Sequence, residues 1–416
     1  MDRRKFSHLV ACGAGSTIAS LAAQAHSSQP QTNESQATGS APKPKQLSAV
    51  VNQSPTAVEP VAVYEYEALA RAALPRPTFE YISTGSADQV TVRENLAAYQ
   101  RIHVVPPLLR GVTQPDLSTT ALGEKISLPV ILAPVAGQRM YHADGALAAA
   151  RAAADAKTIM GISSSVLDSV EEVAQASTGP KWFQLYAPKD REIGKRLIQR
   201  AQRAGFRAII LTVDLGEWKD ADRRNRFTLP REMMIKHLRD FGFVGNFEQM
   251  THDELISFNA SVWDMGMTWE IVDWLRDITR LPVLLKGVLR PDDAVRAVSK
   301  GVQGIVVSNH GGRRLDTMPA TIDVVESIAQ SVAGKVEIYL DGGIRRGTDV
   351  LKAIALGARA VLIGRPYVWA LAAEGETGVK NVLELLRSEL TNAMSACGCN
   401  NTAAISRDLI TRSKLG

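Results

Sequence analysis

Short apolar segments and amphipathic helical segments alternate eight times between residues 127 and 364 of this chain. The apolar segments are nearly continuous runs, which is typical of parallel strands that are buried on both faces. They cover residues 129–134, 158–164, 181–186, 208–214, 282–287, 304–309, 337–343 and 360–364. Eight consecutive strand–helix units predict an α/β chain that closes into a (β/α)8 TIM barrel.

Two segments lie outside this repeating pattern. Residues 64–126 precede the first strand and are expected to form an N-terminal helical cap. A long loop at residues 215–267 separates the fourth strand from its helix, which in a barrel is the position of a lid over the mouth. A doubly wound open sheet is the alternative fold. Its glycine-rich dinucleotide turn is missing after the first strand, where the chain reads Pro134-Val135-Ala136-Gly137.

The N-terminus has the pattern of an export signal. Arg3-Arg4-Lys5 precede a stretch of small, weakly apolar residues at 9–23. Ala23-Gln24-Ala25 then fits a cleavage site before His26. This pattern resembles a twin-arginine signal peptide over residues 1–25 and predicts an exported, periplasmic protein.

The segment after this leader has the composition of a tether. Residues 26–58 are rich in Gln, Ser, Pro, Thr and Asn and cannot bury enough apolar surface to fold. We therefore expect a disordered tether before a barrel domain of residues 59–416, with the protein held at the membrane if the leader is retained. A disordered basic tail and a lipoprotein signal ending at Cys12 are the alternative interpretations of the leader.

Composition excludes other classes of protein. The net charge is only +5, and three of the positive charges lie together at residues 3–5, so we expect no nucleic-acid binding. Three cysteines and seven histidines show no zinc-ligand spacing, so no metal site is expected. Cys397 and Cys399 are interpreted as packing residues.

Glycine-rich segments follow the seventh and eighth predicted strands. They read Asp341-Gly342-Gly343-Ile344-Arg345-Arg346-Gly347 and Gly364-Arg365-Pro366. Glycines let backbone N–H groups approach an anion, helix N-termini favour negative charge, and arginine binds phosphate through two parallel bonds. These segments predict a phosphate site at its usual place in a barrel. Two glycine turns with solvated arginines are the alternative.

Two further strand ends carry ionisable residues. Lys286 closes the fifth strand, where it would either form a Schiff base or stabilise negative charge that develops on a cofactor ring. His310 follows the sixth strand, and Asp214 at the end of the fourth would accept a hydrogen bond from its ring. That bond would set the tautomer of His310, raise its pKa and make it a general base. Arg313 would bind an anionic group of the substrate.

At these residues the chain resembles the FMN-dependent 2-hydroxy acid oxidases and dehydrogenases, from about residue 64 to residue 409. The motifs that carry the resemblance are Tyr81-Ile82-Ser83-Thr84-Gly85, Trp182-Phe183-Gln184-Leu185-Tyr186, Leu211-Thr212-Val213-Asp214, Leu285-Lys286-Gly287, Ser308-Asn309-His310-Gly311-Gly312-Arg313, the Asp341 segment extended to Asp349, and Ile363-Gly364-Arg365-Pro366. The family has the same barrel that the alternation predicts.

The resemblance implies FMN as cofactor and assigns roles to individual residues. The expected FMN-binding residues are Pro134, Val135, Ala136, Ser163, Gln184, Thr212, Lys286, Ser308, Asp341, Gly342, Gly343, Arg345, Gly364 and Arg365. His310 would take the hydroxyl proton as hydride leaves Cα for the flavin, or the Cα proton in a carbanion mechanism. Tyr186 and Tyr81 would hydrogen-bond the substrate, and Arg313 would hold its carboxylate.

The chain departs from the family at two positions. A second carboxylate-binding arginine is expected before Asn225-Arg226-Phe227, but alignment back from that triplet places Lys219 there, unless Arg223 or Arg224 takes its role. Lysine keeps the charge and loses the bidentate fork. Ser165 stands where glycolate oxidase-like members carry a tryptophan, which predicts a roomier pocket for a larger substrate.

The resulting hypothesis is an exported FMN enzyme that oxidises a 2-hydroxy acid to a 2-oxo acid and passes electrons to O2 or to a respiratory acceptor. Twin-arginine export moves folded proteins, which suits an enzyme that loads FMN before export. Two alternatives are a Schiff-base lyase or isomerase on Lys286 and a flavin enzyme redirected to another alcohol. A homotetramer is expected from the resemblance alone.

Overall fold

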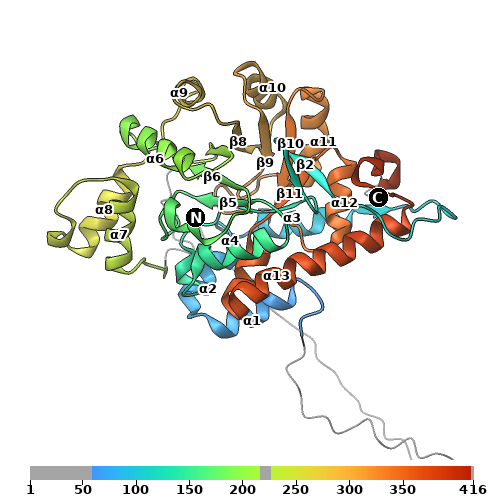
Figure 1. Cartoon of the computed structure of the whole chain (residues 1–416), viewed down its shortest axis with the longest axis horizontal. Helices are drawn as coiled ribbons and strands as arrows, with labels where there is room; N and C mark the ends of the chain where they lie inside the picture. Colours follow the sequence, from blue (N-terminus) through green and yellow to red (C-terminus); the bar gives the residue numbers. More distant parts are fainter. Residues whose placement is uncertain (1–58, 216–225, 414–416) are drawn as a thin grey trace, which may run out of the picture. The chain divides into compact units, whose positions relative to one another are not determined.

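The eight predicted strands close into a parallel barrel in the computed structural model of the chain, which describes residues 59–215 and 226–413 (Figure 1). Around the barrel the strands follow the order β10-β11-β4-β5-β6-β7-β8-β9. They are β4 (Val130–Leu132), β5 (Met160–Ser163), β6 (Lys181–Leu185), β7 (Ala208–Thr212), β8 (Val283–Val288), β9 (Gly304–Val307), β10 (Glu337–Asp341) and β11 (Ala360–Ile363). The predicted fold class is therefore confirmed. The leader, the tether, Lys219, Arg223 and Arg224 lie outside the described residues.

Helices cover the outside of the barrel. They are α4 (Gly145–Asp155), α5 (Val170–Ala176), α6 (Arg191–Arg203), α9 (Glu270–Ile278), α10 (Pro291–Ser299), α11 (Thr321–Val332), α12 (Gly347–Ala355) and α13 (Arg365–Ala396), with 3-10 turns η1 (Gln138–Met140), η4 (Thr402–Ala404) and η5 (Arg407–Leu409). Local signals set their starts: α5 begins with a reciprocal capping box between Ser169 and Glu172. No helix among residues 59–215 and 226–413 is long and apolar enough to cross a membrane.

The cap is helical only in its first part. It contains α1 (Glu65–Ala73), α2 (Arg76–Ser83) and α3 (Val90–Gln100), followed by β1 (Ile102–Val104), which pairs with β12 (Ile410–Arg412), and by the hairpin β2 (Thr119–Ala121)–β3 (Glu124–Ile126). Ala121 and Ile126 of the hairpin are buried in the same apolar cluster as Trp182 and Tyr339 of the barrel strands. The predicted helical cap is therefore present in α1–α3, and residues 102–126 add short strands to it, because the hairpin packs against apolar side chains of the barrel interior.

The described part of the segment after β7 is folded. Within the long connection that was predicted here, it forms α7 (Arg231–Phe241), η3 (Phe247–Gln249) and α8 (His252–Ser261). Figure 1 shows α7 and α8 beside each other in yellow-green, away from the strands. Phe241, Phe243 and Trp263 form an aromatic cluster there, with ring centroids 4.9–6.3 Å apart. Phe241 and Phe243 belong to the main hydrophobic core, and Trp263 packs against it, so the segment is joined to the barrel domain by apolar contacts.

The alternation of side chains along each strand places polar residues near the C-terminal mouth of the barrel. Trp182, Ile210, Leu284, Val306 and Tyr339 belong to the cluster inside the barrel. Because strand side chains point inward at every second residue, the residues two positions later also point inward, one layer nearer the C-terminal mouth. Those residues are Gln184, Thr212, Lys286, Ser308 and Asp341. The strand register therefore places a ring of polar side chains on the mouth side of the apolar cluster inside the barrel.

Candidate active site

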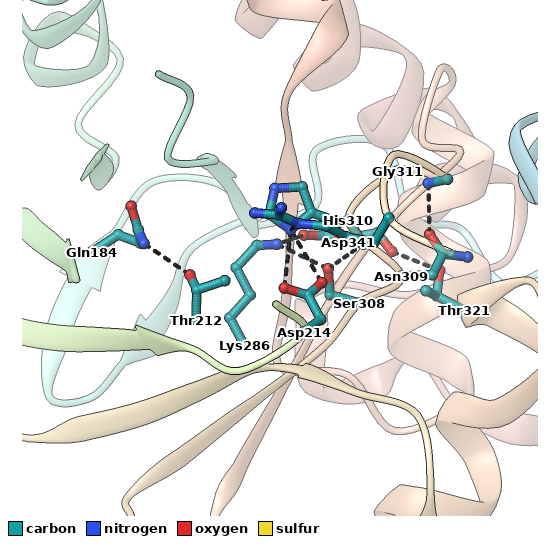
Figure 2. Close-up of polar contacts among 12 residues, drawn as sticks. Gln184, Thr212, Asp214, Lys286, Ser308, Asn309, His310, Gly311, Thr321 and Asp341 are labelled. Carbon is teal, nitrogen blue, oxygen red and sulfur yellow. Dashed lines mark hydrogen bonds and ion pairs between the residues drawn. The ribbon is translucent and has the colours of Figure 1, made fainter. Parts of the chain in front are cut away.

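The polar ring divides into two hydrogen-bonded groups. On one side, Ser163 Oγ donates to Gln184 Oε1 and Gln184 Nε2 donates to Thr212 Oγ1, both at 2.9 Å. All three side chains are buried. On the other side, Lys286, Ser308, Asp341 and Asp214 point toward His310 (Figure 2).

Lys286 is a buried cation in this second group. Its Nζ lies 3.1 Å from Asp341 Oδ2 and donates to Ser308 Oγ at 2.9 Å. Burial alone would lower the pKa of Lys286, but the carboxylates of Asp341 and Asp214 outweigh burial and raise it. The lysine therefore stays protonated over the whole physiological range.

Asp341 has one oxygen that is left for a ligand. Its Oδ1 is buried and has no hydrogen-bond partner among the residues that the structure describes. A buried carboxylate oxygen without a donor is costly, so a bound group that brings a hydroxyl or an N–H here is stabilised.

His310 is held in an unusual backbone conformation next to Asp214. Its φ is 56°, in the left-handed region, and its N–H donates to Ser308 Oγ at 3.0 Å. Its Nδ1 lies 3.0 and 3.1 Å from the two carboxylate oxygens of Asp214. Gly287 makes this approach feasible, because a Cβ there would lie 2.6 Å from the Cβ of Asp214.

The protonation of His310 differs from the expectation. Burial lowers the pKa of His310 to about 3, with Arg314 and Lys286 adding to the effect and Asp214 opposing it. Burial would raise the pKa of Asp214, but His310, Lys286 and Arg314 together hold it well below its ordinary value. The expected rise in the pKa of His310 was therefore wrong, because burial and two cations outweigh one carboxylate.

The neutral imidazole has a defined tautomer. Asp214 is an ionised acceptor, so Nδ1 of His310 carries the ring proton and Nε2 presents a lone pair. Nε2 lies 3.5 Å from the hydroxyl of Tyr186. The open lone pair is what a general base requires.

An amide pair anchors the loop that carries His310. Asn309 Nδ2 donates to Asn95 Oδ1 at 2.8 Å, and Asn95 Nδ2 donates to Asn309 Oδ1 at 2.9 Å. Both side chains are buried. Asn95 lies on α3, so this cap helix positions the base, a role that no motif in the sequence indicated.

Arg313 and Tyr81 lie together at the mouth. The guanidinium of Arg313 lies 5.2 Å from the centroid of the Tyr81 ring. Its Nη1 donates to the backbone oxygens of Tyr81, Ile82 and Thr84 at the end of α2. Both residues line the cavity described below, as substrate-binding residues must.

The predicted phosphate site contains a tight glycine turn. Gly342 and Gly343 have φ of 104° and 83°, and a Cβ on Gly343 would lie 1.9 Å from the backbone oxygen of Asn95. Arg345 stacks 4.9 Å from the Trp369 ring, and burial lowers its pKa to about 10. A buried guanidinium is stabilised by an anion beside it, as a phosphate would be.

The side chain of Arg365 also makes contacts with the backbone. Its guanidinium donates to the backbone oxygens of Gly311 at 2.8 Å, Thr84 at 3.1 Å and Ile82 at 3.2 Å. These bonds tie α2 and the loop of His310 to the start of α13. For an anion at this place, the structure offers the N-terminus of α13.

One continuous cavity of about 670 Å³ joins these parts. Of the predicted residues its lining includes Tyr81, Pro134, Val135, Ala136, Ser165, Tyr186, Lys286, His310, Arg313, Asp341, Gly342, Gly343, Arg345, Gly364 and Arg365. Ser163, Gln184, Thr212, Asp214 and Ser308 do not line it and support it from below or behind. The same cavity extends between apolar residues of the α7–α8 segment, which the sequence did not identify.

Three comparisons with known proteins agree with this geometry. The profile of a family described as FMN-dependent dehydrogenase matches residues 70–412. The chain is 47% identical over 348 residues to glycolate oxidase 1 of Oryza sativa subsp. indica, covering 83% of this chain and 94% of that protein. It is 45% identical over 363 residues to 2-hydroxyacid oxidase 1 of Homo sapiens, covering 85% and 97%. A crystal structure of mandelate oxidase is similar with a TM-score of 0.76 and 40% identity, covering 85% and 98%.

Proposed function

This chain belongs to the FMN-dependent dehydrogenase family, and on that basis we propose that it oxidises 2-hydroxy acids whose side chain is large and apolar. It is an FMN-dependent oxidoreductase that acts on the CH–OH group of a 2-hydroxy acid and yields the 2-oxo acid. The relatives are named as oxidases, which supports O2 as the electron acceptor of this chain.

The residues at the mouth fit FMN. Asp341 Oδ1 is a buried acceptor that suits a hydroxyl of the ribityl chain, and Lys286 is a buried cation that suits negative charge on the ring. Arg345 and the Gly342–Gly343 turn suit the phosphate. When bound, FMN supplies the acceptor for the two electrons that leave the substrate.

The side chains of the chain itself provide positioning and proton transfer. Nε2 of neutral His310 accepts the hydroxyl proton of the substrate, and Asp214 stabilises the imidazolium that results. Tyr186, 3.5 Å from Nε2, is placed to hydrogen-bond the same hydroxyl. Arg313 and Tyr81 are placed to bind the carboxylate.

Schiff-base chemistry on Lys286 is disfavoured by its surroundings. A Schiff base forms from a neutral amine, and enzymes that use one lower the pKa of the lysine. Here Asp341 and Asp214 raise the pKa of Lys286 instead. The same contact that opposes a nucleophilic role supports the electrostatic one.

The apolar part of the cavity carries the substrate proposal. Its apolar lining residues are Leu167, Met234, Ile256, Trp263 and Met265, and the Trp263 ring lies 6.3 Å from the Tyr186 ring, centroid to centroid. Burial of an aromatic or long aliphatic side chain there contributes on the order of 2 kcal/mol, at about 25 cal/mol per Å². Glycolate, which has no side chain, gains none of this.

Flavin bleaching without air tests the proposal. The purified yellow enzyme is mixed with glycolate, lactate, mandelate or 2-hydroxyoctanoate, and the loss of visible flavin absorbance is followed in a stopped-flow instrument. We expect mandelate and 2-hydroxyoctanoate to bleach the flavin with higher second-order rate constants than glycolate. A flavin that none of these acids bleaches would instead favour the redirected alcohol substrate.

Replacing Ser165 with Trp is expected to reverse the substrate preference. The indole would occupy part of the cavity that Ser165 lines, so kcat/KM for mandelate should fall about 10- to 100-fold, because a side chain that is too large for its site costs about 1–3 kcal/mol. kcat/KM for glycolate should change little. Ser165→Ala is the control, and an equal loss for both acids in Ser165→Trp would contradict the steric argument.

We further propose export by the twin-arginine route and a homotetramer. The support is the leader pattern of residues 1–25 for the first, and the family resemblance for the second. N-terminal sequencing of the protein from the periplasm and light scattering of the purified enzyme test the two statements. A start at His26 is expected if the leader is cleaved.

A further inference from the structure

Arg314 touches both polar residues that surround the reacting hydroxyl. Its Nε lies 3.4 Å from Nδ1 of His310, and its Nη2 donates to the hydroxyl of Tyr186 at 3.4 Å. Its guanidinium carbon lies 5.7 Å from the centroid of the Tyr186 ring, and the residue lines the cavity. No motif in the sequence pointed to this arginine.

The contact with His310 is electrostatic rather than a hydrogen bond. Nδ1 of His310 already carries a proton that it directs to Asp214, so two N–H groups face each other across the 3.4 Å. A guanidinium keeps its charge at every accessible pH, so it opposes a second proton on the imidazole.

The other charged neighbours of His310 come from the ends of two strands. Asp214 after β7 favours the imidazolium, while Lys286 on β8 opposes it. The hydroxyl of Tyr186 after β6 lies 3.5 Å from Nε2. Lys286 is itself paired with Asp341 on β10. The balance at the ring therefore depends on Arg314 in addition to the buried pair.

We propose that Arg314 is a positioning residue of this site, which keeps His310 a neutral imidazole with Nε2 open and holds the Tyr186 hydroxyl beside it. The meaning of this role for catalysis rests on the proposed function, but the protonation of the ring does not. Removal of the charge at position 314 should let His310 bind a proton at higher pH, while Asp214 and burial remain unchanged.

The protonation of His310 can be measured without turnover. Diethyl pyrocarbonate acylates the neutral form of imidazole and not the protonated form. The rate of modification of the His310 peptide is read by mass spectrometry from pH 3 to pH 8. The midpoint of this pH dependence reports the protonation of His310. We expect the midpoint to rise by about one pH unit or more in Arg314→Gln and further in Arg314→Glu, since a like charge within about 4–6 Å is lost or reversed. Arg314→Lys should stay near the unchanged enzyme.

A matched control separates this local effect from a change in net charge. Arg290 is exposed and paired with Asp292 at 2.6 Å, so Arg290→Gln removes one positive charge away from the cavity and should leave the midpoint unchanged. The acid limb of the pH profile of kcat/KM should move to higher pH in Arg314→Gln and should lie near its original position in Arg314→Lys. Coincident midpoints in the Gln, Glu and unchanged enzymes would overturn the proposal, even if the substrate assignment holds.

Discussion

Replacing His310 with Asn is expected to lower kcat by about 10²- to 10⁴-fold, the usual contribution of a general base, while FMN stays bound. Asparagine tolerates the left-handed φ of 56° better than alanine does, so the loop and its bond to Ser308 should persist. Its amide, however, cannot accept a proton from the substrate. The measurement is the rate of flavin bleaching by mandelate under argon, together with the visible spectrum of the resting variant.

His103 provides the control for this substitution. It is exposed on β1 and lies outside the cavity lining, so His103→Asn should leave the bleaching rate unchanged. Unaltered bleaching in His310→Asn would remove the base role from His310. Loss of the flavin spectrum would show that the residue acts in cofactor binding instead.

The layer of polar side chains inside the barrel was accessible from the sequence because it depends on local rules. Parallel strands bury both faces, and side chains alternate, so an inward Trp182 requires an inward Gln184, and an inward Leu284 requires an inward Lys286. Residues at the ends of eight such strands meet at one mouth whatever the details of the helices. These rules were therefore sufficient to predict the barrel and its layer of polar side chains from the sequence.

Contacts between distant segments were not accessible in the same way. The side chain of Arg365 donates to backbone oxygens of α2 and of the loop after β9, contacts that its motif did not indicate. The apolar part of the cavity depends on how the α7–α8 segment packs, and no short sequence motif indicates this packing. The protonation of His310 depends on burial and on the sum of Asp214, Arg314 and Lys286. These contacts, the shape of the cavity and the protonation of His310 depend on tertiary packing, and the spacing of residues in the sequence does not determine them.

The two cations near His310, Lys286 and Arg314, act on different groups of the site. Lys286 is committed to Asp341 and Ser308 beneath the mouth, where its charge is available to the cofactor. Arg314 lies against the imidazole and the Tyr186 phenol, where its charge acts on the base. A barrel mouth assembled from separate strand ends allows this, because Lys286 comes from β8 whereas Arg314 comes from the loop after β9.

Replacing Lys286 with Met is expected to destabilise the FMN-free protein by about 3–5 kcal/mol, because the change leaves a buried carboxylate without its partner. Asp341 Oδ2 would lose an ion pair at 3.1 Å, and Oδ1 already has no partner among the described residues. Urea unfolding at pH 7 measures the change. The double variant Lys286→Met/Asp341→Leu should recover most of the loss, and failure to recover would show that the ion pair is not its source.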